Sequence, residues 1–237
     1  MSLSIIMPCY NEEEIIEKVV RSYYAEIQSR IDDFEFIVID DCSKDNTLTK
    51  LQVLSKELPK LKILRPTVNG GHGKALRMGY ETACKEWVFQ VDSDNQFEIK
   101  EFWKLDSMKN RYDFIVGYRK HRHDPLTRLI LTEIIRISNF ILFGVWIKDA
   151  NCPFRLIKND LLKQLLKSVD KNLFAPNIAL SILAARKNNK LTTLPVTHYE
   201  RKTGTCTIKK MKLIKSSLKG LRELFEMRKG LSNTDRS

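Results

Sequence analysis

Short apolar runs that alternate with helical patterns constrain the fold of this chain more than any other feature. In the first half, the strand-like runs are Leu3–Pro8, Phe34–Asp40, Leu61–Leu64, Trp87–Val91 and Phe114–Val116. Helical patterns occupy the segments between and after them, over 12–28, 46–57, 73–85 and 99–108. Continuous apolar strands separated by helices are typical of a sheet covered on both faces. We therefore predict an α/β fold with a mostly parallel sheet flanked by helices.

Polar side chains gather where three of these strands end. The three clusters are Pro8-Cys9-Tyr10-Asn11-Glu12, Asp40-Asp41-Cys42-Ser43 and Asp92-Ser93-Asp94. In open parallel sheets, ligands bind beyond the carboxyl ends of the strands. The clusters therefore predict one binding site at one edge of the sheet.

Asp92 and Asp94 indicate a metal site within that edge. Two carboxylates one residue apart after a buried strand repel each other, and neither has a partner nearby in the sequence. Mg²⁺ is usually held by one or two carboxylates together with phosphate oxygens, and Mn²⁺ prefers the same oxygen ligands. Asp-x-Asp alone is common in loops, so the prediction depends on its position after several strand–helix units.

The second half of the chain departs from the alternation. Residues 125–143 are apolar on most sides, yet they include Arg128, Glu133 and Arg136. Each of these charges costs roughly 2.5–3.5 kcal/mol at a bilayer centre, so we exclude a transmembrane span. We expect a helix that packs on protein or lies in a membrane interface. A polar loop over 148–155, helices over 159–169 and 176–187 and a strand over 190–197 are expected to follow.

Positive charge is concentrated at the C-terminus. The net charge is +12, and residues 201–237 hold eleven lysines and arginines against three acids. An apolar stripe with helical spacing runs through this segment at Ile208, Met211, Ile214, Leu218, Leu221 and Phe225. A basic amphipathic helix suits an anionic membrane surface, and such a stripe also serves to cover a protein core. No aromatic residues interleave with the charge and no nucleic-acid motif is present, so we exclude nucleic acid as a partner.

The cysteines and the N-terminus predict a cytoplasmic protein. The five cysteines are scattered and none forms a Cys-x-x-Cys pair, which favours buried reduced thiols. The chain begins directly with a strand-like run and has no signal-peptide pattern.

Together these motifs resemble the family 2 glycosyltransferases, and more closely their polyprenyl-phosphate, dolichyl-phosphate mannose synthase-like branch. The matching segments are Ile6–Glu12, Ile37–Thr47, Asn69–Leu76, Asp92–Gln96, Gly117–Arg119 and Arg201–Cys206. The resemblance implies the GT-A fold, with a nucleotide-sugar half over 1–120 and a smaller acceptor half over 121–206. The basic amphipathic helix and tail over 207–237 would follow this catalytic domain.

The same resemblance implies roles for individual residues. The residues expected to bind the nucleotide-sugar are Pro8, Tyr10, Asn11, Glu12, Ile39, Asp41, Lys74, Asp92 and Ser93. Those expected to hold Mg²⁺ or Mn²⁺ are Asp92, Asp94 and Gln96, and those for the acceptor phosphate are Arg119, Arg128, Thr132 and Arg201. Asp94, Arg119 and Arg128 are the expected catalytic residues. A carboxylate such as Asp41 suits the ring N–H of uracil or guanine, so the donor is expected to be a UDP- or GDP-sugar.

Departures from the family pattern bear on the acceptor. Asn177 stands where many relatives have an acid, and Cys206 replaces a serine, so neither receives a role. A hydroxyl acceptor needs a general base, whereas a phosphate monoester with a second pKa of about 6 is already largely ionised at pH 7. Asp149 is a candidate base, although a structural role in its loop is the stronger expectation.

The expected function is therefore metal-dependent, inverting transfer of a sugar to a polyprenyl phosphate, such as dolichyl or undecaprenyl phosphate, at the cytosolic membrane face. The alternative is a transferase that acts on a saccharide or protein hydroxyl in cell-surface glycan synthesis. Many relatives carry transmembrane helices after the catalytic domain. Since this sequence shows none there, we expect peripheral membrane association or a membrane partner protein.

Overall fold

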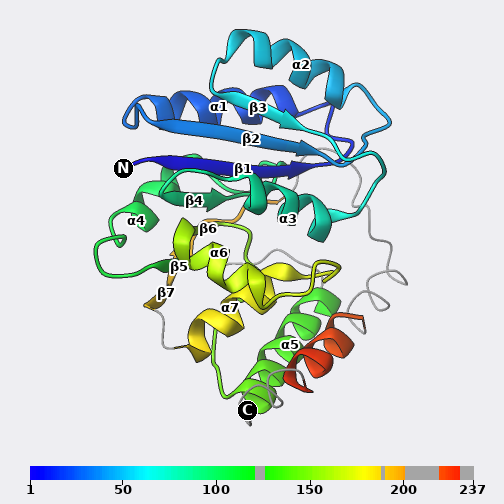
Figure 1. Cartoon of the computed structure of the whole chain (residues 1–237), viewed down its shortest axis with the longest axis vertical. Coiled ribbons are helices and arrows are strands. Elements are labelled where there is room, and N and C mark those ends of the chain that lie inside the picture. The colour runs from blue at the N-terminus through cyan, green and yellow to red at the C-terminus, as the bar shows by residue number, and fades with distance from the viewer. Residues whose placement is uncertain (121–125, 188–189, 201–218, 230–237) are drawn as a thin grey trace.

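The computed structural model describes residues 1–120, 126–187, 190–200 and 219–229, without the side chains of 126–131. These residues form a seven-stranded sheet with the strand order β3-β2-β1-β4-β6-β5-β7 (Figure 1). The strands are β1 (Leu3–Cys9), β2 (Phe34–Asp40), β3 (Leu61–Leu64), β4 (Trp87–Gln90), β5 (Phe114–Arg119), β6 (Arg155–Lys158) and β7 (Leu191–Val196). The β6 strand pairs antiparallel with β4 and β5, and the other pairs are parallel. The mostly parallel α/β sheet is therefore confirmed.

Helices cover both faces of this sheet. They are α1 (Ile16–Gln28), α2 (Thr47–Glu57), α3 (His72–Thr82), α4 (Phe102–Asp106), α5 (Leu126–Phe143), α6 (Asn159–Lys167) and α7 (Pro176–Arg186). A 3-10 turn, η1 (Ile99–Glu101), precedes α4, and residues 219–229 form a further helix. The α1, α2 and α4 helices share one side, and α3, α6 and α7 share the other. The α5 helix packs against α7 at the end of the molecule distant from β3 (Figure 1).

The core forms where the apolar runs are continuous. Every residue of β1, β2 and β4 is buried, as expected for strands with helices on both faces. Gly79 lets α3 lie close to the sheet, because a Cβ at this position would stand 2.5 Å from Ile6 Cγ2 and 2.7 Å from Ile39 Cδ1. A larger residue at position 79 would therefore separate α3 from the sheet.

Several boundaries differ from the predicted ones. The first helix begins at Ile16, after a turn that follows Asn11 (φ 55°), and the predicted helix over 99–108 is divided into η1 and α4. The β5 strand continues beyond Val116, because β7 pairs with it in parallel as far as Arg119. Cys84 is exposed, contrary to the expectation of buried thiols.

The described part of the C-terminal helix packs on protein. Leu224 is buried and Leu221 packs beside it in a small second core with residues of α5 and α7, whereas Phe225 is exposed. Residues 208–218 of the predicted amphipathic helix, and the predicted domain boundary after residue 206, lie outside the described residues. Among the residues that are described, no helix has the length and apolarity needed to cross a membrane.

Candidate functional site

The loops after β1 and β2 are joined at the carboxyl edge of the sheet. The Asn11 backbone N–H donates to Ser43 Oγ (2.9 Å), and the Lys44 N–H donates back to Asn11 Oδ1 (2.8 Å). The Glu12 N–H donates to Thr47 Oγ1 at 2.8 Å. Two of the three predicted clusters therefore form one continuous surface, and Asn11 adopts the left-handed conformation that asparagine tolerates better than most residues.

Asp41 shapes the glycine-rich turn beside this surface. Its carboxylate accepts the backbone N–H of Gly70 (2.8 Å) and of Gly71 (2.7 Å), and its carbonyl accepts Asn69 Nδ2 (2.6 Å). Each carboxylate oxygen carries more than one lone pair, so these bonds leave acceptor capacity for the N–H of a base. The turn leads into α3, and the exposed Lys74 lies in the first turn of that helix.

The predicted nucleotide-sugar residues gather at this edge. Pro8 and Ile39 are register partners in the β1–β2 pair, and Asp92 follows the end of β4, which lies on the other side of β1. Pro8, Glu12, Ile39, Asp41 and Ser93 are buried, whereas Tyr10, Asn11, Lys74 and Asp92 reach the surface. This edge therefore combines a buried floor with polar groups that reach solvent.

The loop after β4 brings the two predicted metal carboxylates to the same edge. Asp92 Oδ1 lies 3.8 Å from His72 Nε2, and Asp94 Oδ1 accepts the backbone N–H of Gln96 at 3.2 Å. The Gln96 side chain donates to the carbonyl of Tyr199 (2.9 Å), which fastens this loop to the segment after β7. Within the described ranges, no group of three His, Cys, Asp or Glu side chains is arranged to hold a metal by itself. Two half-exposed carboxylates that need phosphate oxygens to complete a shell fit Mg²⁺ or Mn²⁺.

A second group of charges lies at the end of β5, whose last residue is Arg119. Arg119 forms a bidentate ion pair with Asp149, with Nε–Oδ2 at 2.7 Å and Nη2–Oδ1 at 3.0 Å. The Asp149 side chain is only 5% exposed. A carboxylate held in this way fits the structural role expected of Asp149, which stays a prediction.

Arg119 and Asp149 border a hollow of about 440 Å³. Its lining residues are Tyr118, Arg119, Lys120, Thr132, Glu133, Arg136, Trp146, Lys148 and Asp149. Four of these are cations and two are acids, so the hollow suits an anion. Arg119 and Thr132 are thus brought together as predicted, while the Arg128 side chain and the whole of Arg201 lie outside the described residues.

Sequence reasoning missed several residues of this hollow. Lys148 lies 4.4 Å above the ring of Tyr118, and Arg136 lies 4.6 Å above the ring of Trp146. The available signal was the run Trp146-Ile147-Lys148, which begins two residues after Gly144, where the positive φ of 68° marks the end of α5. An aromatic and a basic residue after the end of a helix do not indicate a site by themselves, because the sequence does not show that Arg136 and Tyr118 lie beside them.

Asn177 has a structural arrangement that excludes a base at this position. It is buried, its Nδ2 donates to Gln90 Oε1 (3.0 Å), and its Oδ1 lies within hydrogen-bond distance of the Tyr80 hydroxyl (3.0 Å). An amide cannot take up a proton as a carboxylate does, and this one is engaged inside the protein.

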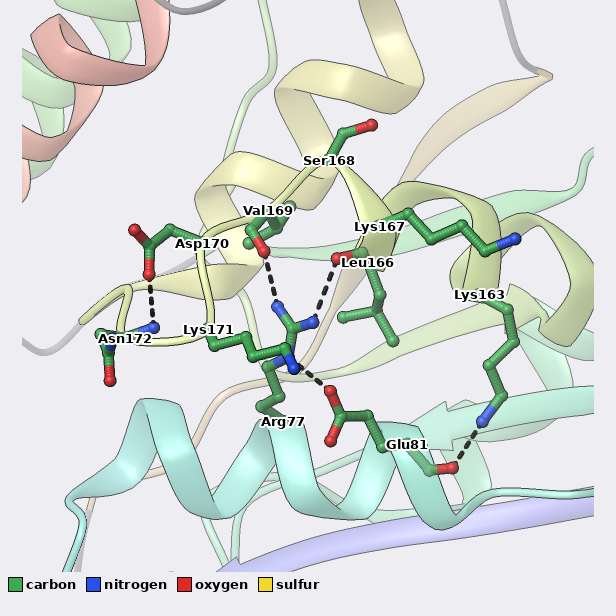
Figure 2. A pocket seen from close by; sticks show the side chains of 10 residues that line it. All are labelled: Arg77, Glu81, Lys163, Leu166, Lys167, Ser168, Val169, Asp170, Lys171 and Asn172. Carbon is green, nitrogen blue, oxygen red and sulfur yellow. Dashed lines mark hydrogen bonds and ion pairs between the residues drawn. The ribbon is translucent and has the colours of Figure 1, made fainter.

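A larger hollow of about 830 Å³ lies between α3 and the α6–α7 connection (Figure 2). Arg77 extends into it from α3 and donates to the carbonyls of Val169 (2.7 Å) and Leu166 (3.1 Å). Lys163 donates to the carbonyl of Glu81 at 2.7 Å. These cations serve to hold backbone groups, and none of the strand-end clusters lines this hollow.

Known proteins resemble this chain in sequence. Residues 4–167 match the profile described as glycosyl transferase family 2. The undecaprenyl-phosphate 4-deoxy-4-formamido-L-arabinose transferase of Yersinia enterocolitica is 27% identical over 215 residues, which cover 90% of this chain and 64% of that protein. A dolichyl-phosphate beta-glucosyltransferase of Trichomonas vaginalis is 26% identical over 208 residues, which cover 82% and 64%. The chain thus matches 64% of the length of each of these curated relatives.

Solved structures resemble it in fold. Glucosyl-3-phosphoglycerate synthase from Mycobacterium tuberculosis, crystallised with Mn²⁺, uridine diphosphate and phosphoglyceric acid, superposes with a TM-score of 0.70 at 17% identity. The match covers 96% of this chain and 78% of that one. At this identity the likeness bears on the fold alone, and it confirms the predicted GT-A architecture.

Proposed function

We propose a function from the premise that the chain belongs to glycosyl transferase family 2. It transfers a sugar, with inversion and with the help of Mg²⁺ or Mn²⁺, from a UDP- or GDP-sugar to a polyprenyl phosphate at the cytosolic face of a membrane. The names of the relatives, which act on undecaprenyl and dolichyl phosphates, support this acceptor class.

One observation carries the choice of acceptor. The two acids among the residues that line the smaller hollow are both in ion pairs, Asp149 with Arg119 and Glu133 with Arg136. A carboxylate fixed by a cation is a poor base, and a hydroxyl acceptor needs a base to remove its proton. A phosphate monoester needs cations instead, because it is already largely ionised at pH 7. The hollow therefore suits a phosphate better than a hydroxyl.

The reaction follows from these two groups of residues. An oxygen of the acceptor phosphate attacks the anomeric carbon from the face opposite the leaving group, so a new C–O bond forms as the bond to the nucleoside diphosphate breaks. Asp149 holds the Arg119 guanidinium by its Nε and Nη2, which fixes the plane of this cation before the acceptor arrives. When bound at Asp92, Asp94 and Gln96, the metal supplies positive charge for the diphosphate oxygens.

The donor half uses the first cluster of loops. Asp41 maintains the glycine-rich turn before α3, and the N-terminus of this helix together with Lys74 suits the negative charge of a diphosphate. The base and ribose then lie beside Tyr10 and Asn11, which reach the surface at the edge where Pro8 and Ile39 are buried. In this arrangement the sugar lies between the carboxylates after β4 and the cations after β5.

In this proposal, the exposed apolar face of α5 contacts the membrane. The residues Ile134, Ile137, Phe140 and Ile141 are exposed on this helix, and Trp146 is exposed beside them. Trp146 makes an edge contact with Phe140 (ring centres 5.8 Å apart) and also lines the phosphate hollow. An apolar face with an aromatic residue and nearby cations suits the boundary between lipid chains and headgroups. The lipid tail of the acceptor stays in the bilayer while its phosphate reaches the hollow.

A transfer assay tests the proposal. The purified full chain is incubated with Mn²⁺ or Mg²⁺, a panel of radiolabelled UDP- and GDP-sugars, and polyprenyl phosphate in detergent. Label that moves into the organic phase only with a metal present supports the proposal and identifies the donor. Donor consumption with a soluble saccharide acceptor, and no label in the organic phase, would contradict it.

The lipid contact has its own test. Ile141 is 74% exposed, so Ile141→Asp is expected to leave the melting temperature unchanged. The same change places a charge at the lipid boundary and is expected to weaken sedimentation of the chain with anionic phospholipid vesicles. Unchanged sedimentation would show that α5 does not contact lipid.

A further inference from the structure

We propose that Arg155 is a positioning residue that links the metal-binding loop to the acceptor cation pair, an inference that rests on the proposed function. Arg155 begins β6 and its side chain is completely buried, although it is a long, charged group. Across the sheet it is the register partner of Gln90 on β4 and of Val116 on β5. It therefore lies between the strand that leads to Asp92 and the strand that leads to Arg119.

One side of the guanidinium holds the loop that follows Asp149. Arg155 Nε donates to the Cys152 carbonyl (3.0 Å), and Nη2 donates to the carbonyls of Cys152 (2.5 Å) and Ala150 (3.1 Å). The Cys152 N–H in turn donates to the Asp149 carbonyl at 3.1 Å. The position of Asp149, and with it the orientation of Arg119, therefore depends on this clamp.

The other side reaches the metal loop through two amide side chains. Arg155 Nη1 donates to the Asn177 carbonyl (3.1 Å), and the Asn177 side chain donates to Gln90 Oε1 (3.0 Å). Tyr80 supports this link, because its one hydroxyl proton can be donated to Gln90 Oε1 (2.9 Å) or to Asn177 Oδ1 (3.0 Å). Gln90 Nε2 lies 3.5 Å from Asp92 Oδ1, so the chain of contacts ends at a predicted metal ligand.

The burial of the Arg155 charge is unfavourable, which indicates a role for this residue beyond packing. A buried charge destabilises the folded state unless it is well compensated, and apolar residues of similar volume often replace buried ion pairs without loss of stability. Within the described ranges Arg155 forms no ion pair and is held by carbonyl groups. Burial lowers the pKa of its guanidinium, and Asp149 and Asp92 are among the groups that act in the opposite direction. Tyr80 and Cys152 act in this direction as well, and the two carboxylates, Asp149 and Asp92, belong to the two parts of the site that Arg155 joins.

The test uses Arg155→Lys in the full chain. Lysine keeps the positive charge but lacks the planar fork, so it cannot maintain bonds to all three carbonyls. We expect the Kd for Mn²⁺ in the presence of UDP, measured by electron paramagnetic resonance of the free ion, to rise by about 10-fold, as is typical when a group behind a metal ligand is changed. We expect the KM for polyprenyl phosphate to rise with it.

Arg77→Lys is the matched control. Arg77 is also a largely buried arginine that donates to two carbonyls, those of Val169 and Leu166, but it lies in the other hollow (Figure 2). Arg77→Lys is expected to lower the melting temperature without changing the Kd for Mn²⁺ or the KM for polyprenyl phosphate. If Arg155→Lys likewise lowers only the melting temperature, or changes only one of the two constants, the inference is wrong.

A second variant decides the question if Arg155→Lys does not fold. Tyr80→Phe removes one hydroxyl from the link to Gln90 and keeps the ring in place. It is expected to weaken Mn²⁺ binding with little change in the KM for the acceptor, and unchanged Mn²⁺ binding would overturn the inference. The Mn²⁺ titration contains no acceptor, so it gives its answer even if the wild-type chain transfers no sugar to polyprenyl phosphate and the proposed function fails.

Discussion

Asp149→Asn separates a positioning role for this carboxylate from a role as a general base. The Asp149–Arg119 pair is bidentate and its side chains are 5% and 15% exposed, so solvent screens it little. Asparagine keeps one acceptor oxygen and therefore loses one of the two charge-assisted hydrogen bonds. Hydrogen bonds to charged groups contribute about 1.5–3 kcal/mol, and we expect the free energy of unfolding to fall by that amount.

The effect on catalysis completes this prediction. If Asp149 only orients Arg119, kcat/KM for polyprenyl phosphate falls while the shape of its pH profile is retained, because no proton is transferred to residue 149. A general base typically contributes 10²–10⁴-fold, and its loss also removes its ionisation from the pH profile. The assays are urea unfolding and the pH dependence of label transfer.

Glu133→Gln is the control in the same hollow. Glu133 pairs with Arg136, but its side chain is 47% exposed, so we expect a loss of roughly 0–1 kcal/mol. A large loss of activity for Asp149→Asn with unchanged stability and a lost ionisation would refute the positioning role, and with it the argument for a phosphate acceptor.

Three further predictions concern other residues. Asp94→Ala is expected to abolish transfer nearly completely without unfolding the chain, and turnover near the wild-type rate would remove the metal role of Asp94. Arg128→Ala is expected to raise the KM for the acceptor more than that for the donor, and equal effects on both would contradict its assignment to the acceptor phosphate. Burial alone would raise the pKa of Glu35, but hydrogen bonds from Lys62, Ser4 and Cys84 lower it to about 2. Since the folded-state pKa lies below the unfolded value, this stabilisation is present above the unfolded pKa and is lost as the pH falls toward 2. Glu35→Gln should make the free energy of unfolding decrease less steeply as the pH falls over that range. An unchanged decrease would contradict the lowered pKa of Glu35.

The sequence allowed prediction of the parts of the fold that depend on local pattern. The β2 boundaries were predicted correctly, because a strand buried on both faces is a largely apolar run that ends at polar residues. The boundaries of the partly exposed edge strand β3 were also predicted correctly, from three apolar residues interrupted only by Lys62. The end of β5 was not, since Gly117-Tyr118-Arg119 has no strand pattern of its own. These residues are extended because β7, more than seventy residues later, pairs with them.

The same distinction applies to the site. Asp41 and Asp92 were identifiable because they follow strands whose carboxyl ends meet at one edge of the sheet. The engagement of Asp41 by the N–H groups of Gly70 and Gly71 was not predictable, since it depends on the conformation of a turn nearly thirty residues away. Arg155 was predicted only as the end of a polar loop, because nothing in the local pattern indicates that it begins a strand with its charge buried.

The measurement that decides the choice of acceptor compares polyprenyl phosphate with polyprenol of the same chain length. The two lipids differ only in the phosphate, so differences in lipid binding cancel. With the labelled donor identified in the transfer assay, we predict label in the organic phase with the phosphate alone. We also predict a rate that rises as the pH passes the second phosphate pKa of about 6. Comparable transfer to polyprenol would contradict this prediction and indicate a hydroxyl acceptor and a base that lies elsewhere in the chain.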